Sequence, residues 1–242
     1  VLQRSQAIAR ADENRHLAAV IANLLGDVAS DRGDLAQAEA RYREAIAIAE
    51  EAQCQPEALE ASLNLGRLLL ERFELKASGE LATRGRELAD AAGNQAMRTT
   101  ALALLASLAR VSQNGDGQPL IEEAIAHVET HKNPDGRWPI YLEAALAARD
   151  REDLAAAQSW SREVRKVLQA QLDAVPAAHR ESFRARRDRR HAYRETAAFV
   201  AKAAEQGGVG LGWGRLLEGT SAWPASTACS ACSSTSWTRR SS

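Results

Sequence analysis

The stretch that decides the fold is AAVIANLLGDVASDRGDLAQAEARYREAIAIAEE, residues 18–51. Its first part alternates apolar and polar residues with the period of a helix. The spacing predicts an amphipathic helix over about 17–30, with Val20, Leu24 and Val28 on one face. A helix of this kind must bury that face against another element.

A second helix is expected directly after the first, over about 35–53. Gly33 ends the first helix because glycine adopts the left-handed conformation without strain, and Asp34 is placed to cap the next helix. The second helix carries a narrow face of small residues with one large aromatic residue: Ala38, Tyr42, Ala45 and Ala49. Small residues allow two antiparallel helices to approach closely, and Tyr42 would fill the gap between them. One such hairpin cannot bury its apolar face alone, so it must stack on neighbours.

The same pattern returns at intervals of about forty residues, which indicates an array of helical hairpins. Leu25-Gly26 recurs as Leu65-Gly66, and Asp34-Leu35 recurs three periods later as Asp153-Leu154. The tetrapeptide Glu-Ala-Ile-Ala occurs at both 44–47 and 123–126.

Composition agrees with an all-α fold. The 242 residues are 45% hydrophobic but only 5% aromatic, and Ala and Leu dominate. The net charge of -1 argues against a general polyanion binder. No apolar run is long enough to cross a bilayer and no signal segment is recognisable, so a cytoplasmic protein without a membrane partner is expected.

These residues resemble the tetratricopeptide repeat family. The match is best over 19–52, where six residues stand at the consensus spacing of that family: Leu25, Gly26, Gly33, Ala38, Tyr42 and Ala45. Weaker copies cover about 59–92, 99–131 and 137–171, and the likeness extends over roughly 1–172. The resemblance implies an α-α superhelix, a solenoid of antiparallel helix hairpins. We expect Leu25, Tyr42, Leu65 and Leu105 to be buried in it.

The family further implies a non-catalytic scaffold for protein–protein interaction, with a concave groove lined by the first helix of each repeat. Projected onto this chain, the partner-binding residues are Asn23, Asp27, Ser30, Arg67, Glu71, Ser107 and Arg110. The longer repeat unit resembles the repeat segments of large bacterial signalling proteins that carry a Ser/Thr kinase or an enhancer-type ATPase. The expected partner is therefore another protein or a neighbouring domain. No catalytic residue, cofactor or metal is expected.

An arginine-rich segment follows the repeats. It carries Arg180, Arg184, Arg186, Arg187, Arg189, Arg190 and Arg194. We expect a capping helix within 173–206 that docks through Phe183, Tyr193 and Phe199, since the end of a solenoid needs a cover. Binding of nucleic acid or another phosphate-rich partner through 180–194 is one alternative, and binding to an acidic interdomain partner is another.

A small metal-dependent enzyme is a weaker alternative. His127 and His131 are spaced to share a metal on one helix face, but surface histidines without a metal are the more common case. Cys229 and Cys232 form a CxxC pair without a second ligand pair. Neither set predicts a metal site on its own.

Both ends of the chain look unlike complete repeats. Residues 1–14 align with the second helix of a repeat, which suggests that the array begins mid-repeat. Residues 207–242 read as a Gly-rich linker and a disordered tail that loses acids, Leu and helical periodicity after Glu218. GC-rich codons of our choosing for 220–242, read one nucleotide out of register, spell an amphipathic helix like that leading into a GAF sensor domain. We therefore expect the tail to be out of frame.

Overall fold

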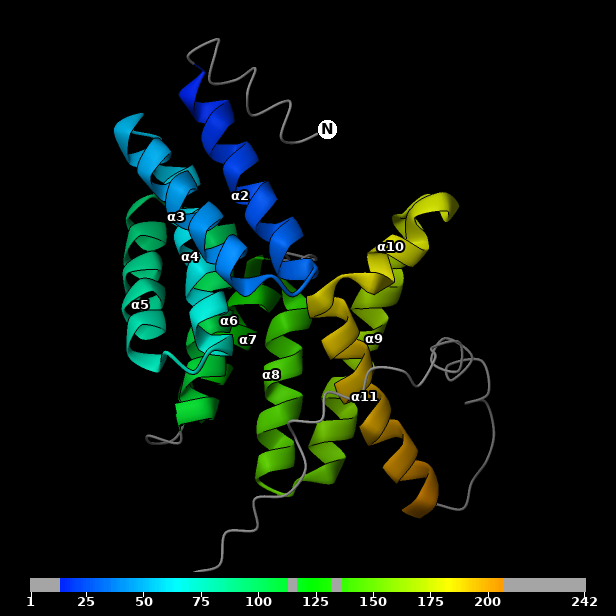
Figure 1. Ribbon diagram of the computed structural model, residues 1–242. Coiled ribbons are helices and arrows are strands. Elements are labelled where there is room, and N and C mark those ends of the chain that lie inside the picture. Colours follow the sequence, from blue (N-terminus) through cyan, green and yellow to red (C-terminus); the bar gives the residue numbers. More distant parts are fainter. Residues whose placement is uncertain (1–13, 113–116, 132–135, 207–242) are drawn as a thin grey trace, which may run out of the picture. The chain divides into compact units, whose positions relative to one another are not determined.

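The computed structural model describes residues 14–112, 117–131 and 136–206, and side chains up to residue 199 (Figure 1). Every regular element in these residues is a helix, so the all-α prediction is confirmed. The elements are α2 (Arg15–Asp31), α3 (Leu35–Glu51), α4 (Gln55–Glu71), α5 (Leu75–Ala91), α6 (Gln95–Ser112), α7 (Gln118–His131), α8 (Arg137–Asp150), α9 (Leu154–Ala174), η1 (Ala177–His179), α10 (Arg180–Ala185) and α11 (Arg187–Gln206).

The forty-residue period has a simple structural cause. Each helix from α2 to α5 has 17 residues. Each is joined to the next by three residues, so that helices begin at 15, 35, 55, 75 and 95. One hairpin together with its following link therefore repeats after forty residues.

The links share one backbone turn that ends a helix, and in three of them the side chain of Asp34, Asn94 or Asp153 also caps the helix that follows. In the first link, the Gly33 N–H donates to the Ser30 carbonyl at 2.9 Å and the Asp34 N–H donates to the Ala29 carbonyl at 3.0 Å. This pair of bonds is the Schellman motif, which satisfies the last free carbonyls of a helix. The Asp34 carboxylate then accepts the Gln37 N–H at 3.0 Å and caps α3 as expected.

The second residue of each such link has a positive φ. Gly33 was the residue expected to do this, and its φ is 82°. The left-handed residues are Gly33, Gln53, Phe73, Gly93 and Glu152. A side chain in this region costs roughly 1 to 2 kcal/mol, so the three non-glycine links are held by their hydrogen bonds and by helix packing.

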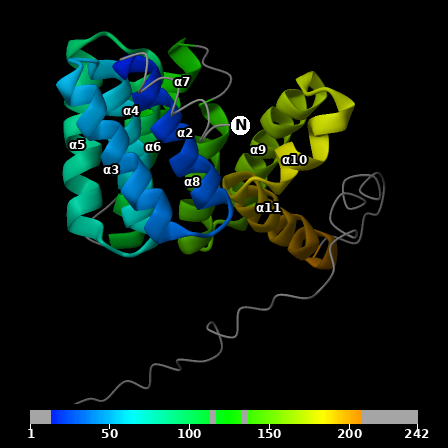
Figure 2. The same cartoon turned by 45° about the horizontal axis from the view of Figure 1, so that its top comes forward.

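Within the described part of residues 14–203, the helices pack consecutively and form two rows. Helices α2, α4, α6 and α8 form one row, in which each helix contacts the next. Helices α3 and α5 belong to the second row and pack against the first (Figure 2). The first helix of every hairpin therefore belongs to one row, which we call the inner row.

Tyr42 locks the first hairpin. Its side chain is 1% exposed, as expected, and it lies between α2 and α3. A Cβ added at Gly26 would lie 2.5 Å from two ring carbons of Tyr42, so only glycine leaves room for the ring. Ala38, Ala45 and Ala49 are also buried and allow the close approach of the two helices.

Some expected core positions are only partly buried. Leu65 is buried, whereas Leu25 and Leu105 are half-buried at the edges of the core. The prediction that α2 buries the face containing Leu24 was wrong, because the Leu24 side chain is 42% exposed. Alanines on the adjacent face of α2, with Ile21, pack against α3 and α4 instead, since the small side chains permit the shorter interhelix distance.

The arginine-rich segment is not one helix. Arg186 has an extended backbone, with φ -58° and ψ 140°, which ends α10 and redirects the chain into α11. Helix α11 lies along α8 and α9 (Figures 1 and 2). Its Ala192 and Phe199 are buried in the same apolar cluster as Trp138, Ile140 and Val164, and Tyr193 packs against that cluster.

The expectations about residues 1–13 and 207–242 fall outside the described residues. These include the partial repeat at the start, the CxxC pair and the out-of-frame tail. They remain predictions.

Candidate protein-binding groove

Four of the seven projected partner-binding residues lie around one small cavity. They are Asp27 and Ser30 on α2 and Arg67 and Glu71 on α4. The remaining walls come from Asp31 and Tyr42 and from three residues of the arginine-rich segment: Arg186, Arg187 and Asp188. Equivalent turns of two neighbouring inner-row helices therefore converge on one site, which we call the α2/α4 groove.

The floor of the α2/α4 groove is the half-buried carboxyl group of Asp27. The Tyr42 hydroxyl donates to Asp27 Oδ1 at 2.9 Å. Burial raises the pKa of Asp27 above its usual value, although the bond from Tyr42 and the nearby Arg67 and Arg186 lower it. Burial and the adjacent Asp27 also raise the pKa of Tyr42, so the hydroxyl stays protonated and remains a donor. The base of the groove thus holds a carboxyl group that accepts a hydrogen bond from Tyr42.

Arg187 and Arg186 enter this groove from the other end of the chain. The Arg187 backbone N–H donates to Asp31 Oδ1 at 3.0 Å across 156 residues of sequence. The Arg187 guanidinium Nη1 lies 2.7 Å from Glu71 Oε2, and Arg186 Nε lies 3.5 Å from Asp31 Oδ2. Asp31 therefore caps α11 in addition to pairing with Arg186.

The paired side chains are each a third or more exposed to solvent. At that exposure an ion pair contributes at most about 1 kcal/mol. The cavity left between them measures about 40 Å³, which is room for about one water molecule. The arginine pair therefore fills the groove, but the ion pairs hold it there weakly.

The other three projected residues do not join the groove. Asn23 is buried, and its Oδ1 accepts a hydrogen bond from Asn64 at 3.0 Å. Ser107 donates to the Ala103 carbonyl within its own helix. Arg110 forms an ion pair with Glu143 of α8 at 2.7 Å. The contacts of Asn23 and Arg110 join neighbouring inner-row helices, and that of Ser107 satisfies its hydroxyl within its own helix.

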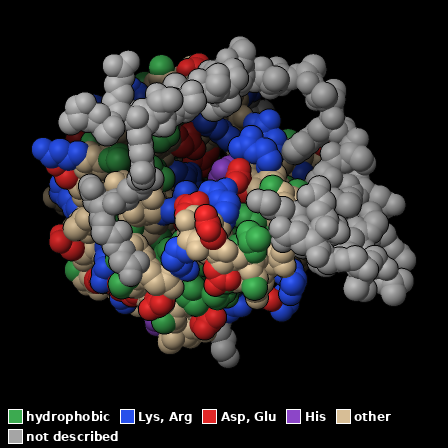
Figure 3. Space-filling model, turned by 90° about the horizontal axis from the view of Figure 1, so that it is seen from below, with side chains coloured by type: hydrophobic (Ala, Val, Ile, Leu, Met, Phe, Trp, Pro, Cys, Tyr) green, Lys and Arg blue, Asp and Glu red, His purple; other side chains and the backbone are tan. Residues whose placement is uncertain are grey.

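Sequence reasoning missed half of the groove. The arginine-rich segment was expected to dock through its aromatic residues, and no role was predicted for Asp31. The signal that could have found the missing half is charge complementarity, since an acidic turn and a basic segment occur in one chain of nearly balanced charge. Figure 3 shows one face on which basic and acidic side chains are interspersed.

One histidine of the pair is buried, contrary to expectation, whereas His131 is exposed. His127 is 6% exposed, and its ring centroid lies 4.6 Å from that of His131. Its Nε2 lies 3.3 Å from the Gln95 carbonyl oxygen. Burial lowers the pKa of His127, which favours the neutral ring. Among the described residues this pair is not part of any three-ligand cluster.

None of the helices in the described ranges is long and apolar enough to cross a bilayer. Comparison with known proteins finds no family model and no curated relative that matches this chain.

Proposed function

We propose that this chain is a non-catalytic scaffold of the tetratricopeptide type, whose hairpins stack as a superhelix and whose inner row binds a basic segment of a protein partner. One observation carries the proposal: the α2/α4 groove receives Arg186 and Arg187 of its own chain. Asp31 pairs with Arg186 and Glu71 pairs with Arg187, and Asp27 lines the same cavity.

The chain's own arginine pair then acts as a built-in competitor. A partner segment with two adjacent arginines could take its place at little cost, because each existing ion pair is partly exposed. When a partner binds, the displacement of α11 would transmit the binding event to the residues that follow α11. This arrangement suits the repeat segment of a bacterial signalling protein, which is the role that the resemblance of residues 19–52 suggests.

Nucleic-acid binding through 180–194 remains the alternative proposal. Two of its arginines, Arg186 and Arg187, are already paired with acidic groups, and Arg189 lies over the Phe183 ring at 4.0 Å. These contacts reduce the positive charge available to phosphates, which weighs against this alternative.

The test uses a fluorescein-labelled peptide of residues 182–191, SFRARRDRRH, and fluorescence anisotropy with the full chain. The double variant Arg186→Ala/Arg187→Ala should bind the peptide more tightly than the unmodified chain does, because the internal competitor is gone. Adding Glu71→Gln to that variant should weaken binding about 5-fold, the upper range for a partly exposed ion pair.

Two controls accompany this test. Glu87→Gln removes an exposed carboxylate of α5, far along the chain from the groove residues, and should leave binding unchanged. A peptide with alanine at both central arginines should not bind. Equal affinity of the unmodified chain and the double variant, or no effect of Glu71→Gln, would overturn the proposal.

A further inference from the structure

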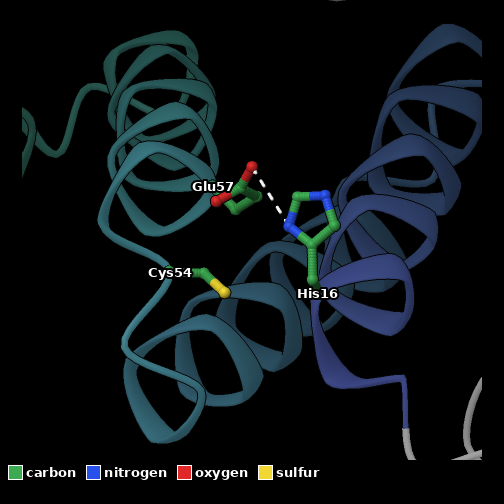
Figure 4. Close-up of side chains that lie close together, drawn as sticks. All are labelled: His16, Cys54 and Glu57. Carbon is green, nitrogen blue, oxygen red and sulfur yellow. Dashed lines mark ion pairs between the residues drawn. The ribbon is translucent and has the colours of Figure 1, made fainter.

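Three side chains of types that can bind a metal lie together at the opposite end of the first hairpins. His16 is the second residue of α2, Cys54 directly precedes α4, and Glu57 is the third residue of α4. Their ligand atoms all lie within 4.8 Å of one another, and His16 Nδ1 is 3.3 Å from Glu57 Oε1 (Figure 4). The imidazole, thiol and carboxylate face a common space between the starts of α2 and α4.

The donor set suits one metal in particular. Thiolate, imidazole and carboxylate are the three protein ligands of zinc, which binds them in tetrahedral geometry at about 2.0 to 2.3 Å. Ligand atoms in such a site lie about 3.3 to 3.6 Å apart. The His16 side chain is 58% exposed and that of Glu57 is 20% exposed, so small rotations could bring the three donors to this spacing.

Cys54 occupies a position that most other links use for helix capping. Asp34, Asn94 and Asp153 each accept a backbone N–H of the helix that follows. Cys54 makes no such bond, and its thiol has only a 3.5 Å contact with the Ala52 carbonyl. A missing cap costs about 1 kcal/mol, so the thiol does not serve the local fold in this way.

The backbone nevertheless fixes the place of Cys54. Its N–H donates to the Ala49 carbonyl at 2.8 Å in the same turn motif as the other links. His16 and Glu57 lie in the first turns of two neighbouring inner-row helices. The three ligands are therefore held by rigid elements, and ordering them on a metal requires only side-chain rotation.

We propose that His16, Cys54 and Glu57 bind one Zn²⁺ ion, with water in the fourth position, and so fasten the start of α2 to the link between α3 and α4. The thiol releases its proton on binding. The thiolate and the carboxylate then balance the two charges of the ion, and the imidazole binds as the neutral ring.

The experiment uses the full chain with Cys229→Ser and Cys232→Ser, so that Cys54 is the only thiol. After chelator treatment, the reduced protein is titrated with Co²⁺ as a spectroscopic probe and then with Zn²⁺. We expect one equivalent of Co²⁺ to produce a thiolate-to-cobalt charge-transfer band that Zn²⁺ abolishes. Zinc should also raise the melting temperature.

Three variants in the same background locate the ligands. Cys54→Ser should abolish the band, and His16→Ala and Glu57→Gln should each weaken zinc binding about 10-fold or more. His127→Ala and Glu60→Gln are the matched controls and should bind as the parent does. Absence of the band in the parent, or zinc binding that survives Cys54→Ser undiminished, would overturn the proposal.

Discussion

At the residue scale, Gly26, Tyr42 and Asp27 form one unit that joins the core to the groove. The ring of Tyr42 needs the absence of a side chain at residue 26, and its hydroxyl binds the carboxyl group at residue 27. The sequence predicted the buried tyrosine from the small residues around it. The hydrogen bond could not be predicted, because the helical period gives the face of a residue and not the direction of its polar atom.

Gly26→Ala should destabilise the protein by about 1 to 3 kcal/mol, since the new methyl group overlaps the Tyr42 ring and forces a core rearrangement. Gly79→Ala is the matched control. A Cβ at Gly79 of α5 meets nothing within 4 Å, so this change should stabilise the helix by about 0.5 to 1 kcal/mol. Urea denaturation measures both effects, and a neutral Gly26→Ala would show that the helices are farther apart.

Asp27→Asn should change how stability depends on pH. The folded pKa of Asp27 lies above its ordinary value of 3.8, so its favourable contribution is present below pH 3.8 and is lost as pH rises through the folded pKa. Asparagine can still accept the Tyr42 bond but has no charge to bury. The stability of the variant relative to the unmodified chain should therefore increase over that pH interval.

The measurement for Asp27→Asn is urea denaturation at pH values from below 3.8 to neutral. Asp34→Asn, an exposed helix cap that keeps an acceptor, serves as the control for removing a carboxylate. A relative stability of Asp27→Asn that falls with rising pH would contradict the direction of the shift.

At the scale of the elements, the three-residue link is the unit that sets the repeat. Gly33 and Asp34 revealed the first link from sequence, because their residue types match the left-handed and capping positions. Gln53, Phe73 and Glu152 occupy the same conformation without that signal. Helix packing imposes the turn on them, which local sequence patterns do not record. The break at Arg186 was missed for a related reason, since arginine has no preference against the helix interior.

Phe73→Gly should stabilise the protein by roughly 0.5 to 1 kcal/mol. The Phe73 side chain is 76% exposed and its φ is 60°. The change removes left-handed strain and loses little burial, although glycine adds entropy to the unfolded chain. Gly33→Ala is the converse variant and should destabilise, because φ is 82° at that position. Thermal unfolding compares them, and a lower melting temperature for Phe73→Gly would show that the phenyl ring stabilises the fold.

At the scale of the whole described molecule, the repeated hairpins produce the stack of helices, and the arginine-rich segment completes the walls of the groove. The forty-residue period predicted helices that pack in succession, and four of the residues projected from the family resemblance line one cavity. Which of them would meet could not be predicted, because Asp31 and Arg187 are 156 residues apart and no local pattern links them. Asn23 and Arg110 were placed on the inner row but bind neighbouring helices instead.

We propose that a basic segment of a partner replaces Arg186 and Arg187 in the α2/α4 groove. The Arg187 amide reports this directly. It lies in the first turn of α11, where an N–H has no acceptor within its own helix, so Asp31 is its partner.

The decisive measurement is the rate of hydrogen exchange at the Arg187 amide. NMR monitors this rate in the ¹⁵N-labelled full chain with and without the unlabelled 182–191 peptide. We predict that saturating peptide accelerates exchange at Arg187, because it takes Asp31 from that amide, while the buried Val164 amide of α9 stays protected. Peptide binding that leaves exchange at Arg187 unchanged would place the binding site elsewhere and contradict the account.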